Sequence, residues 1–251
     1  MKKILYFFVL LSVFLVLFKT FSDIKNTSTD SDFSNNIDFS TMSMACIGSS
    51  STIPVKVDKA YPTVVKEMLG LRRVFNYGVS WSTLAYKEDC HCHPDSEYDH
   101  SPYVYRYLDM QKADIIIVQG GGHNDYGCLI PIGTPEDNTP NTFYGGLNIL
   151  LSGLKRNFPD SYIVVMTGFN TYGDTGSSSD AKNADGVYYR EYANAILKSC
   201  KNHNIDCLDV YHNLPFDRET DTVDRTHPTQ EYINKVWSPA IVKFIKSNYK
   251  K

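Results

Sequence analysis

The sequence lacks the dense basic runs through which proteins usually bind nucleic acid. Its 25 lysines and arginines are outnumbered by 28 aspartates and glutamates, which gives a formal net charge of −3. This charge pattern argues against a nucleic-acid-binding protein, and no nucleic-acid partner is expected. Internal repeats are also missing. Because hydrophobic residues make up 42% of the chain, a folded body is expected rather than a disordered chain.

Cysteine is too scarce to form the scaffold of a domain of this size, although an even number permits disulfides in an exported chain. The six cysteines are Cys46, Cys90, Cys92, Cys128, Cys200 and Cys207. Cys200 and Cys207 are the favoured pair, because they lie close together across a predicted helix-to-strand turn. Residues 90–93, with His100 nearby, have the sequence Cys-His-Cys-His but lack the Cys-x2-Cys pairing of zinc sites. A loop with one disulfide is favoured there, and no metal is expected.

The N-terminus has the pattern of an export signal. Lys2 and Lys3 precede an uncharged apolar run from Ile4 to Phe18, as in secretory signals. The run is short for a transmembrane helix, which needs about 20 apolar residues. Because Thr20-Phe21-Ser22 matches a cleavage site only weakly, residues 1–21 are predicted to be either a cleaved signal peptide or a retained membrane anchor. Both alternatives predict a location outside the cytoplasm.

The rest of the chain divides into a polar linker over residues 22–41 and one domain over residues 42–251. Within the domain, short apolar runs alternate with longer helical patterns. The predicted strands are Met42–Ile47, Arg72–Tyr77, Asp114–Gln119, Tyr162–Thr167 and Ile205–Val210. The predicted helices are Tyr61–Leu69, Phe143–Arg156, Val187–His203 and Pro228 to about Ser247. This alternation predicts an α/β three-layer sandwich around a five-stranded parallel sheet.

Four polar or glycine-rich segments adjoin the predicted strand ends or the last helix. They are Ile47–Thr52, Asn76–Ser80, Gly120–Asp125 and Asp224–Pro228. Ligands of such sheets bind beyond the carboxyl ends of the strands, so these segments are expected to converge there. The glycine-rich segment lacks the Lys-Ser/Thr that a nucleotide-binding loop requires.

The side chains in these segments suit acyl transfer, which needs a hydroxyl nucleophile, a base and donors for an oxyanion. Ser50 offers the hydroxyl. Asp224 precedes His227 by three positions, close enough for its carboxylate to orient the imidazole. The amide of Asn124 can donate a hydrogen bond to an oxyanion.

Together the four segments resemble the four sequence blocks of the SGNH (GDSL-type) hydrolases. The family pattern Gly-Asp-Ser-x-Thr is matched by Gly48–Thr52, which implies that Ser50 is the nucleophile. The Asp-x-x-His block falls on Asp224 and His227, which implies a triad with Ser50. The resemblance spans nearly all of the predicted domain and implies the same five-stranded SGNH/flavodoxin-like fold.

The resemblance also implies which groups bind the oxyanion. They are the backbone N–H groups of Ser50 and Gly78 and the side-chain amide of Asn124, which lies in the family's Gly-x-Asn-Asp block. Asp125, next in that block, is expected to organise the loop by hydrogen bonds to the backbone.

The sequence departs from the family pattern at two positions. Ser49 stands where the family has aspartate. Trp81 stands where many relatives carry a small residue, so it is expected to narrow the acyl pocket or to stack against a sugar. Trp81 and His123 are the predicted substrate contacts.

These features predict an exported serine esterase that removes short acyl groups, chiefly O-acetyl, from an envelope or extracellular carbohydrate through an acyl-Ser50 intermediate. Its substrate would be a small-molecule or polysaccharide ester, and residues 4–18 would form any membrane tether. No cofactor is expected, because serine acyl transfer needs none. An O-acetyltransferase with the same triad, a lipase-like esterase and a degenerate glycan-binding module remain as alternatives.

Overall fold

The computed structural model describes residues 37–88, 102–171 and 182–250. They contain a five-stranded sheet in which every pair of neighbouring strands is parallel. The strand order is β2-β1-β3-β4-β5, which is the doubly wound order of flavodoxin-like proteins. The strands are β1 (Ser43–Gly48), β2 (Arg73–Gly78), β3 (Ile115–Gln119), β4 (Tyr162–Met166) and β5 (Asp206–Leu208). The predicted α/β fold is confirmed.

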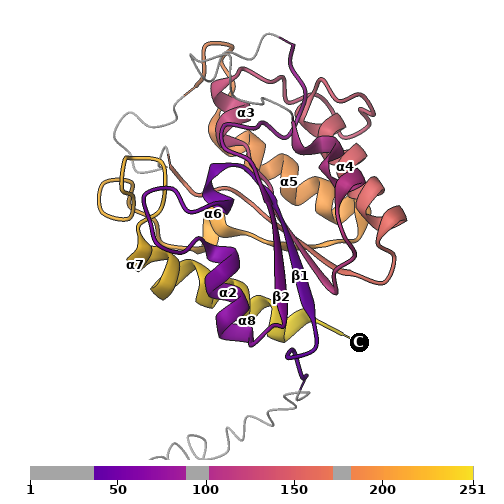
Figure 1. The fold of residues 1–251 in the computed structure, drawn as a ribbon. Helices are drawn as coiled ribbons and strands as arrows, with labels where there is room; N and C mark the ends of the chain where they lie inside the picture. The colour runs from indigo at the N-terminus through magenta and orange to yellow at the C-terminus, as the bar shows by residue number, and fades with distance from the viewer. Residues whose placement is uncertain (1–36, 89–101, 172–181, 251) are drawn as a thin grey trace, which may run out of the picture. The chain divides into compact units, whose positions relative to one another are not determined.

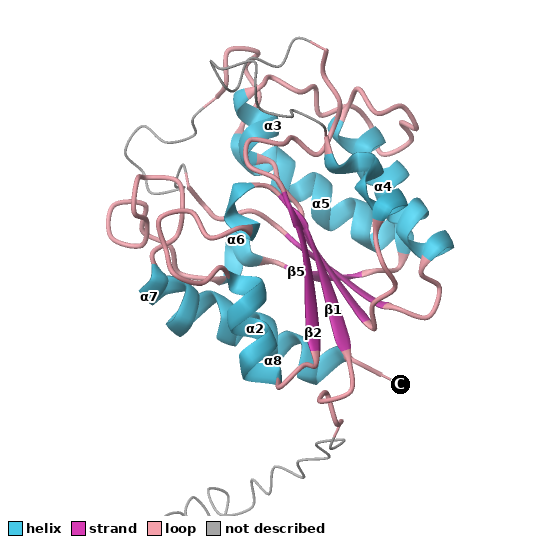
Figure 2. Ribbon diagram, in the orientation of Figure 1, coloured by secondary structure: helices cyan, strands magenta, loops and turns pink. Residues whose placement is uncertain are grey.

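Helices cover both faces of this sheet (Figures 1 and 2). On one face α4 (Phe143–Asn157) packs against α5 (Tyr189–His203). On the other face α2 (Tyr61–Leu69) packs against α8 (Ser238–Asn248). The sheet is therefore the middle layer of three, as predicted.

The central strands are buried because both of their faces are covered. Ile115–Gln119 is buried along its whole length, which explains its run of consecutive apolar residues. Successive residues of β1 point into opposite layers. Ala45 and Ile47 belong to the apolar cluster that includes α4 and α5, whereas Cys46 contacts Tyr61 of α2.

Local signals fix the ends of the longer helices. Gly70 ends α2 in the left-handed conformation, with a φ of 70°, which glycine adopts more readily than other residues. Thr142 begins α4, and its hydroxyl accepts the N–H of Gly145. Asn204 ends α5, also in the left-handed conformation. These boundaries lie within two positions of the predicted ones.

The last helix differs from the prediction of one continuous helix from Pro228 to about Ser247. The structure has α7 (Gln230–Tyr232), a π-helical turn η3 (Ile233–Trp237) and then α8. Pro228 lies outside the helix, because Thr229 caps α7 with its hydroxyl. Pro239 has no N–H and would clash with the preceding turn of a regular helix. The wider π turn before it accommodates that proline.

Four short elements were not predicted, because a single turn carries no periodic apolar pattern. They are η1 (Ser50–Thr52), η2 (Tyr103–Asp109), α3 (His123–Gly127) and α6 (Val210–Asn213). Three of them begin within four positions of a strand's carboxyl end: η1 after β1, α3 after β3 and α6 after β5. They shape the edge of the sheet where the predicted site lies.

The predicted Cys200–Cys207 disulfide is wrong, since both residues carry free thiols. The Cys207 thiol is hydrogen-bonded to Cys200, and this bond and burial raise the pKa of Cys207. The thiolate that disulfide formation requires is therefore disfavoured. Cys128 is disulfide-bonded. The prediction for residues 90–93 lies outside the described residues.

Both ends of the described domain lie at the amino edge of the sheet. The Phe39 ring, just before β1, contacts the ring of Tyr249 after α8 at a centroid distance of 5.8 Å. Tyr249 also contacts Tyr162 at the start of β4. Within the described ranges no helix is both long and apolar enough to cross a membrane. The predicted export segment, residues 4–18, lies outside those ranges.

Candidate active site

Ser50 lies in the tight turn η1 that follows β1 directly. The turn is closed by a hydrogen bond of 3.0 Å from the N–H of Thr52 to the carbonyl of Ser49. A Cβ at Gly48 would collide with the hydroxyl of Thr52 and with Gln119, so only glycine fits at this position. The Ser50 residue is only 9% exposed.

The imidazole of His227 connects Ser50 to Asp224. Its Nε2 lies 2.8 Å from the Ser50 hydroxyl oxygen. Its Nδ1 lies 3.0 Å from Oδ2 of Asp224. The same carboxylate accepts the backbone N–H of His227 at 2.9 Å. The structure therefore brings the three predicted residues together as a hydrogen-bonded triad.

Asp224 is held in its ionised form. Burial alone would raise its pKa, but hydrogen bonds from His227 and Lys56 outweigh burial and lower the pKa to about 2. The Lys56 ammonium lies 3.2 Å from the Asp224 carboxylate. Lys56 adopts a φ of 53°, an uncommon conformation for a residue with a side chain. An anionic Asp224 fixes the Nδ1–H tautomer of His227 and leaves Nε2 free to accept a proton from Ser50.

A compact turn presents Asp224 and His227 together. Arg225 between them has a φ of 67°, and its carbonyl accepts a hydrogen bond of 2.6 Å from Nε of Arg218. The carbonyl of His227 accepts the N–H of Val223 at 2.9 Å. These contacts stabilise an unfavourable backbone conformation at the site.

Asn124 lies in the first turn of α3, beyond the carboxyl end of β3. Its side-chain Nδ2 donates to the carbonyl of Ser82 at 2.9 Å. An amide nitrogen carries two hydrogens, and the bond to Ser82 uses one of them. Asn124 and Ser50 line the same small cavity.

Asp125 organises the segment that follows β2. Its buried carboxylate accepts the backbone N–H groups of Leu84, Ala85 and Gly122. Burial raises the pKa of Asp125 to about 6, and these three hydrogen bonds oppose the rise. Asp125 thus connects the segment after β2 to the segment after β3, as expected from the sequence.

The backbone N–H of Gly78 already takes part in a hydrogen bond within β2. It donates to Oδ1 of Asn76 at 2.9 Å, and Nδ2 of Asn76 donates to the carbonyl of Thr52 at 2.7 Å. Donation from Gly78 to an oxyanion would require exchange of this bond. The role of Gly78 stays a prediction, and this hydrogen bond counts against it.

The cavity beside Ser50 is small, at about 20 Å³. Its lining consists of Ser49, Ser50, Ser51, Gln119, His123, Asn124, Gly168, Phe169, Thr171, Tyr189 and Thr226. His123 thus lies beside Ser50, and its role as a substrate contact stays a prediction. Burial together with Arg218 and His227 lowers its pKa to about 4. Its imidazole is therefore neutral at pH 7.

Trp81 is not among the residues that line this cavity. It follows β2 by three positions, is 39% exposed and has a φ of 63°. A large exposed aromatic side chain on an uncommon backbone conformation is a feature that functional sites often contain. Its place after β2 puts it at the same edge of the sheet as Ser50.

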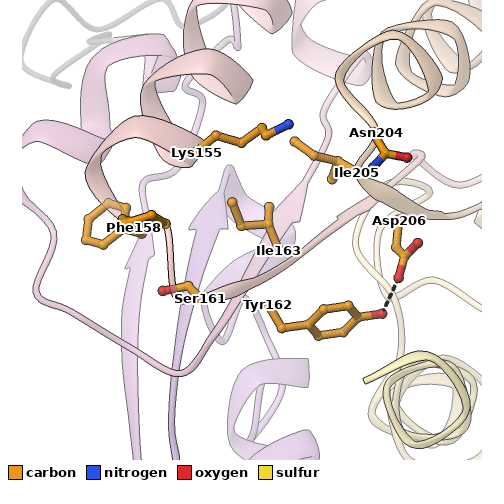
Figure 3. A pocket seen from close by; sticks show the side chains of 9 residues that line it. Lys155, Phe158, Ser161, Tyr162, Ile163, Asn204, Ile205 and Asp206 are labelled. Carbon is orange, nitrogen blue, oxygen red and sulfur yellow. Dashed lines mark hydrogen bonds between the residues drawn. The ribbon is translucent and has the colours of Figure 1, made fainter. Parts of the chain in front are cut away.

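A larger hollow of about 430 Å³ lies at the opposite edge of the sheet (Figure 3). It includes Lys155, the start of β4 and the start of β5, and Tyr162 donates there to Asp206 at 2.7 Å. It contains neither a serine–histidine pair nor a histidine. Size alone therefore does not identify the reactive site of this molecule.

The geometry around Ser50 suits one type of chemistry. A hydroxyl lies within hydrogen-bonding distance of an imidazole, the imidazole of a carboxylate, and an amide donor lies beside them. This is the arrangement of acyl transfer by a serine hydrolase. The model of the GDSL-like lipase/acylhydrolase family matches residues 46–231.

The chain belongs to this family. It is an ester-hydrolysing serine hydrolase.

Solved structures agree with the family in fold. A Lactobacillus plantarum protein is 26% identical, with a TM-score of 0.71 over 84% of this chain and 99% of its own. An aryl esterase of M. smegmatis is 17% identical, with a TM-score of 0.58 over 83% of this chain and 100% of its own. A carbohydrate acetylesterase family member from Sinorhizobium meliloti is 14% identical, with a TM-score of 0.52 over 82% of this chain and 99% of its own. No curated protein matches the sequence.

Three side chains near the site of this GDSL-like hydrolase were not predicted. Lys56 contacts the Asp224 carboxylate, and Gln119 has its Oε1 3.5 Å from the backbone nitrogen of Ser49. Arg106 donates to the carbonyl of Gly48. Lys56 and Arg106 stand in no motif, and no local pattern identifies them. Gln119 does leave a signal in the sequence, because it is a polar residue at the end of the apolar strand β3.

Proposed function

We propose that this hydrolase removes short acyl groups, chiefly acetyl, from an ester-linked carbohydrate outside the cytoplasm. The observation that carries the proposal is the small cavity beside the Ser50 hydroxyl. A water molecule needs about 10–15 Å³ of such space, so about 20 Å³ suits a methyl group and not a long acyl chain.

In the proposed mechanism Ser50 is the nucleophile. Its oxygen attacks the ester carbonyl carbon while Nε2 of His227 takes the hydroxyl proton. The resulting imidazolium is stabilised by Asp224 and gives that proton to the departing alcohol. Water then attacks the acyl-Ser50 ester, with His227 again as the base. The acid is released and the Ser50 hydroxyl is restored.

The oxyanion of each tetrahedral intermediate needs donors that are already oriented. The backbone N–H of Ser50 and the side-chain amide of Asn124 are the proposed donors. The hydrogen bond from Asn124 to Ser82 supports this role, because it fixes the plane of the amide before substrate binds. Gly78 could join them only after release of its bond to Asn76.

The walls of the cavity support a short acyl group. Phe169 forms one wall and is itself held by a stacked contact with Phe216 at 4.8 Å and an edge contact with Trp237 at 4.5 Å. A Cβ at Gly168 would meet the Tyr189 hydroxyl at 2.6 Å. A rigid aromatic wall of this kind does not yield readily to a longer chain.

Carbohydrate as the alcohol part rests on Trp81 and His123. The exposed ring of Trp81 offers an apolar face with a polar N–H at its edge, which suits a sugar ring. The neutral His123 can donate or accept hydrogen bonds from sugar hydroxyls without an ion pair. The S. meliloti neighbour is described as a carbohydrate acetylesterase family member, which is consistent with this proposal.

The test compares acyl groups and alcohols on the full chain. The 4-nitrophenyl esters of acetate, butyrate and octanoate measure acyl length, and acetate release from O-acetylated xylan measures action on a carbohydrate. Acetate is expected to be the best acyl group, with kcat/KM for octanoate lower by about 10²-fold. Equal rates for octanoate and acetate would contradict the acyl part of the proposal.

Two controls separate the remaining parts. Hydrolysis of the aryl acetate without any release of acetate from polysaccharides would contradict the carbohydrate part alone. Addition of a soluble sugar acceptor tests for transfer, because an acetyltransferase would give acetylated sugar in place of free acetate. The location is tested by protease added to intact cells that express the chain, which should degrade an extracytoplasmic enzyme.

A further inference from the structure

The segment η2 contacts the carboxyl ends of three adjacent strands. It precedes β3 in the chain and packs against α4. Arg106 of η2 contacts the ends of β1 and β2, and the Tyr103 hydroxyl donates to the carbonyl of Gln119 at the end of β3 at 3.1 Å. The loops that carry Ser50, Ser82 and Asn124 begin where these strands end.

The contact made by Arg106 joins two strands through one nitrogen. Its Nη1 donates to the carbonyl of Gly48 at 2.9 Å and to the carbonyl of Tyr77 at 2.9 Å. Gly48 and Tyr77 lie on neighbouring parallel strands, at the last step of their pairing. The Gly48 carbonyl also accepts the N–H of Val79. The guanidinium therefore adds a link between β1 and β2 at the point where the strands separate.

The position of this link is what connects it to the reaction. Gly48 lies two residues before Ser50, in a turn so tight that no side chain fits at Gly48. Beyond Tyr77 the chain runs through Val79 to Ser82, whose carbonyl holds the amide of Asn124. A shift of the β1 end against the β2 end would therefore move the Ser50 hydroxyl relative to Asn124.

Arg106 is itself held in place. Its guanidinium lies over the ring of Tyr103 at 5.4 Å from the centroid, and such cation–π contacts favour a fixed orientation. A planar guanidinium loses less freedom on forming its hydrogen bonds than a lysine ammonium does. The carbonyls of Gly48 and Tyr77 therefore accept hydrogen bonds from a guanidinium with a fixed orientation.

We propose that Arg106 is a positioning residue for ester hydrolysis. It fixes the turn that carries Ser50 against the segment that orients Asn124, and it does so without contact to substrate. This inference rests on the proposed roles of Ser50 and Asn124 but not on the identity of the alcohol.

The test replaces Arg106 and follows hydrolysis of 4-nitrophenyl acetate by the full chain. Displacement of reacting groups by about 1 Å can lower rates by about 10²-fold. Arg106→Met is expected to lower kcat by about 10- to 100-fold with little change in KM, at a temperature where the variant is folded. Titration of Ser50 with an organophosphonate gives the number of active sites, so that kcat refers to intact enzyme.

Arg73→Met is the matched control. Arg73 also lies over an aromatic ring, that of Phe75, but it is at the other end of β2, far from Ser50 in the pairing. Its replacement is expected to leave kcat unchanged. An equal fall in kcat from both variants would overturn the proposal, because the effect would then not depend on the link between Gly48 and Tyr77.

Chemical rescue tests geometry separately from stability. Guanidinium chloride at millimolar concentration is expected to raise kcat of Arg106→Ala, because the ion can occupy the vacated position between the two carbonyls. Tetramethylammonium, which has no N–H donor, should give no increase.

If Arg106→Met fails to fold, Arg106→Lys takes its place, with a kcat between wild type and Arg106→Ala. Full kcat in the folded variants, with only the melting temperature lowered, would overturn the proposal.

Failure of this inference is distinct from failure of the proposed function. If Ser50→Ala retained activity, the mechanism proposed for the site would be wrong and Arg106 would have no reaction to assist. If Ser50→Ala were inactive while the Arg106 variants kept full kcat, only the positioning role would be wrong.

Discussion

Nε2 of His227 lies 2.8 Å from the hydroxyl oxygen of Ser50, although 177 positions separate the two residues in the chain. The pairing depends on the parallel sheet, which brings the end of β1 to the same edge as the turn before α7. Variants of Ser50, of Asp224 and of the residues around them test this arrangement.

Ser50→Ala should abolish ester hydrolysis, because the alanine has no oxygen to attack the carbonyl. We expect kcat for 4-nitrophenyl acetate to fall by about 10⁴-fold or more, with an unchanged circular dichroism spectrum. Ser49→Ala and Ser51→Ala are matched controls in the same turn and should remain active. An inactive Ser49→Ala beside an active Ser50→Ala would show that the family pattern has been matched in the wrong register.

Asn124→Ala should lower kcat by about 10²-fold or more with little change in KM. The amide would bind an oxyanion that exists only in the transition state, and loss of such a contact lowers kcat and kcat/KM alike. Because Asn124 also bonds to Ser82, the melting temperature must be measured beside the kinetics. A rise in KM alone would make Asn124 a residue for substrate binding.

Asp224→Asn should lower kcat by about 10²-fold or more, since asparagine does not stabilise an imidazolium. The pKa of Asp224 is about 2 in the folded protein and 3.8 as the ordinary value. A lowered pKa stabilises the fold above the ordinary value, and this stabilisation is lost as pH falls toward 2. The melting temperatures of wild type and Asp224→Asn should therefore converge between about pH 5 and pH 2. A constant difference over that range would contradict the lowered pKa.

Asp125→Asn should destabilise the protein by about 1–3 kcal/mol. Both carboxylate oxygens accept backbone N–H groups. In asparagine one of these oxygens is replaced by an NH₂ group, which cannot accept a hydrogen bond from a backbone N–H. Urea unfolding measures the loss.

Burial raises the Asp125 pKa to about 6, so the native state binds a proton more tightly than the unfolded chain. This group's contribution to wild-type stability should fall as pH rises from about 4 to 6, and Asp125→Asn should lack that dependence.

Phe169→Ala should widen the acyl specificity. Removal of the ring that walls the cavity beside Ser50 creates space for more methylene groups. We expect kcat/KM for 4-nitrophenyl butyrate to rise relative to acetate by about 10-fold, at some cost in stability. Phe158→Ala serves as the control, because Phe158 is buried like Phe169 but lies at the opposite edge of the sheet. An unchanged ratio of butyrate to acetate would mean that Phe169 does not limit acyl length.

Most of the fold could be predicted because its strands are apolar at consecutive positions and its long helices carry a clear period. All five strands occur within two residues of their predicted limits. The helix α3 was missed because it follows three glycines and has only five residues. The π turn before Pro239 could not be foreseen, because a proline predicts an interruption of a helix but not the form that the interruption takes.

The grouping of Ser50, Asp224 and His227 could be predicted because each stands in a motif beside a strand or helix end. The partners of these residues could not. Lys56 reaches Asp224 through an uncommon backbone conformation, and Arg106 reaches Gly48 from a segment whose place is set by packing on α4. Such contacts arise from tertiary structure and leave no local pattern in the sequence.

The contact between Phe39 and Tyr249 fixes the position at which the chain enters the domain. The chain enters at the amino edge of the sheet, where the six-residue strand β1 begins and spans about 20 Å, and Ser50 lies beyond the far edge. Immobilisation of the protein through the chain before Phe39 would therefore attach the domain at the edge opposite the reactive serine.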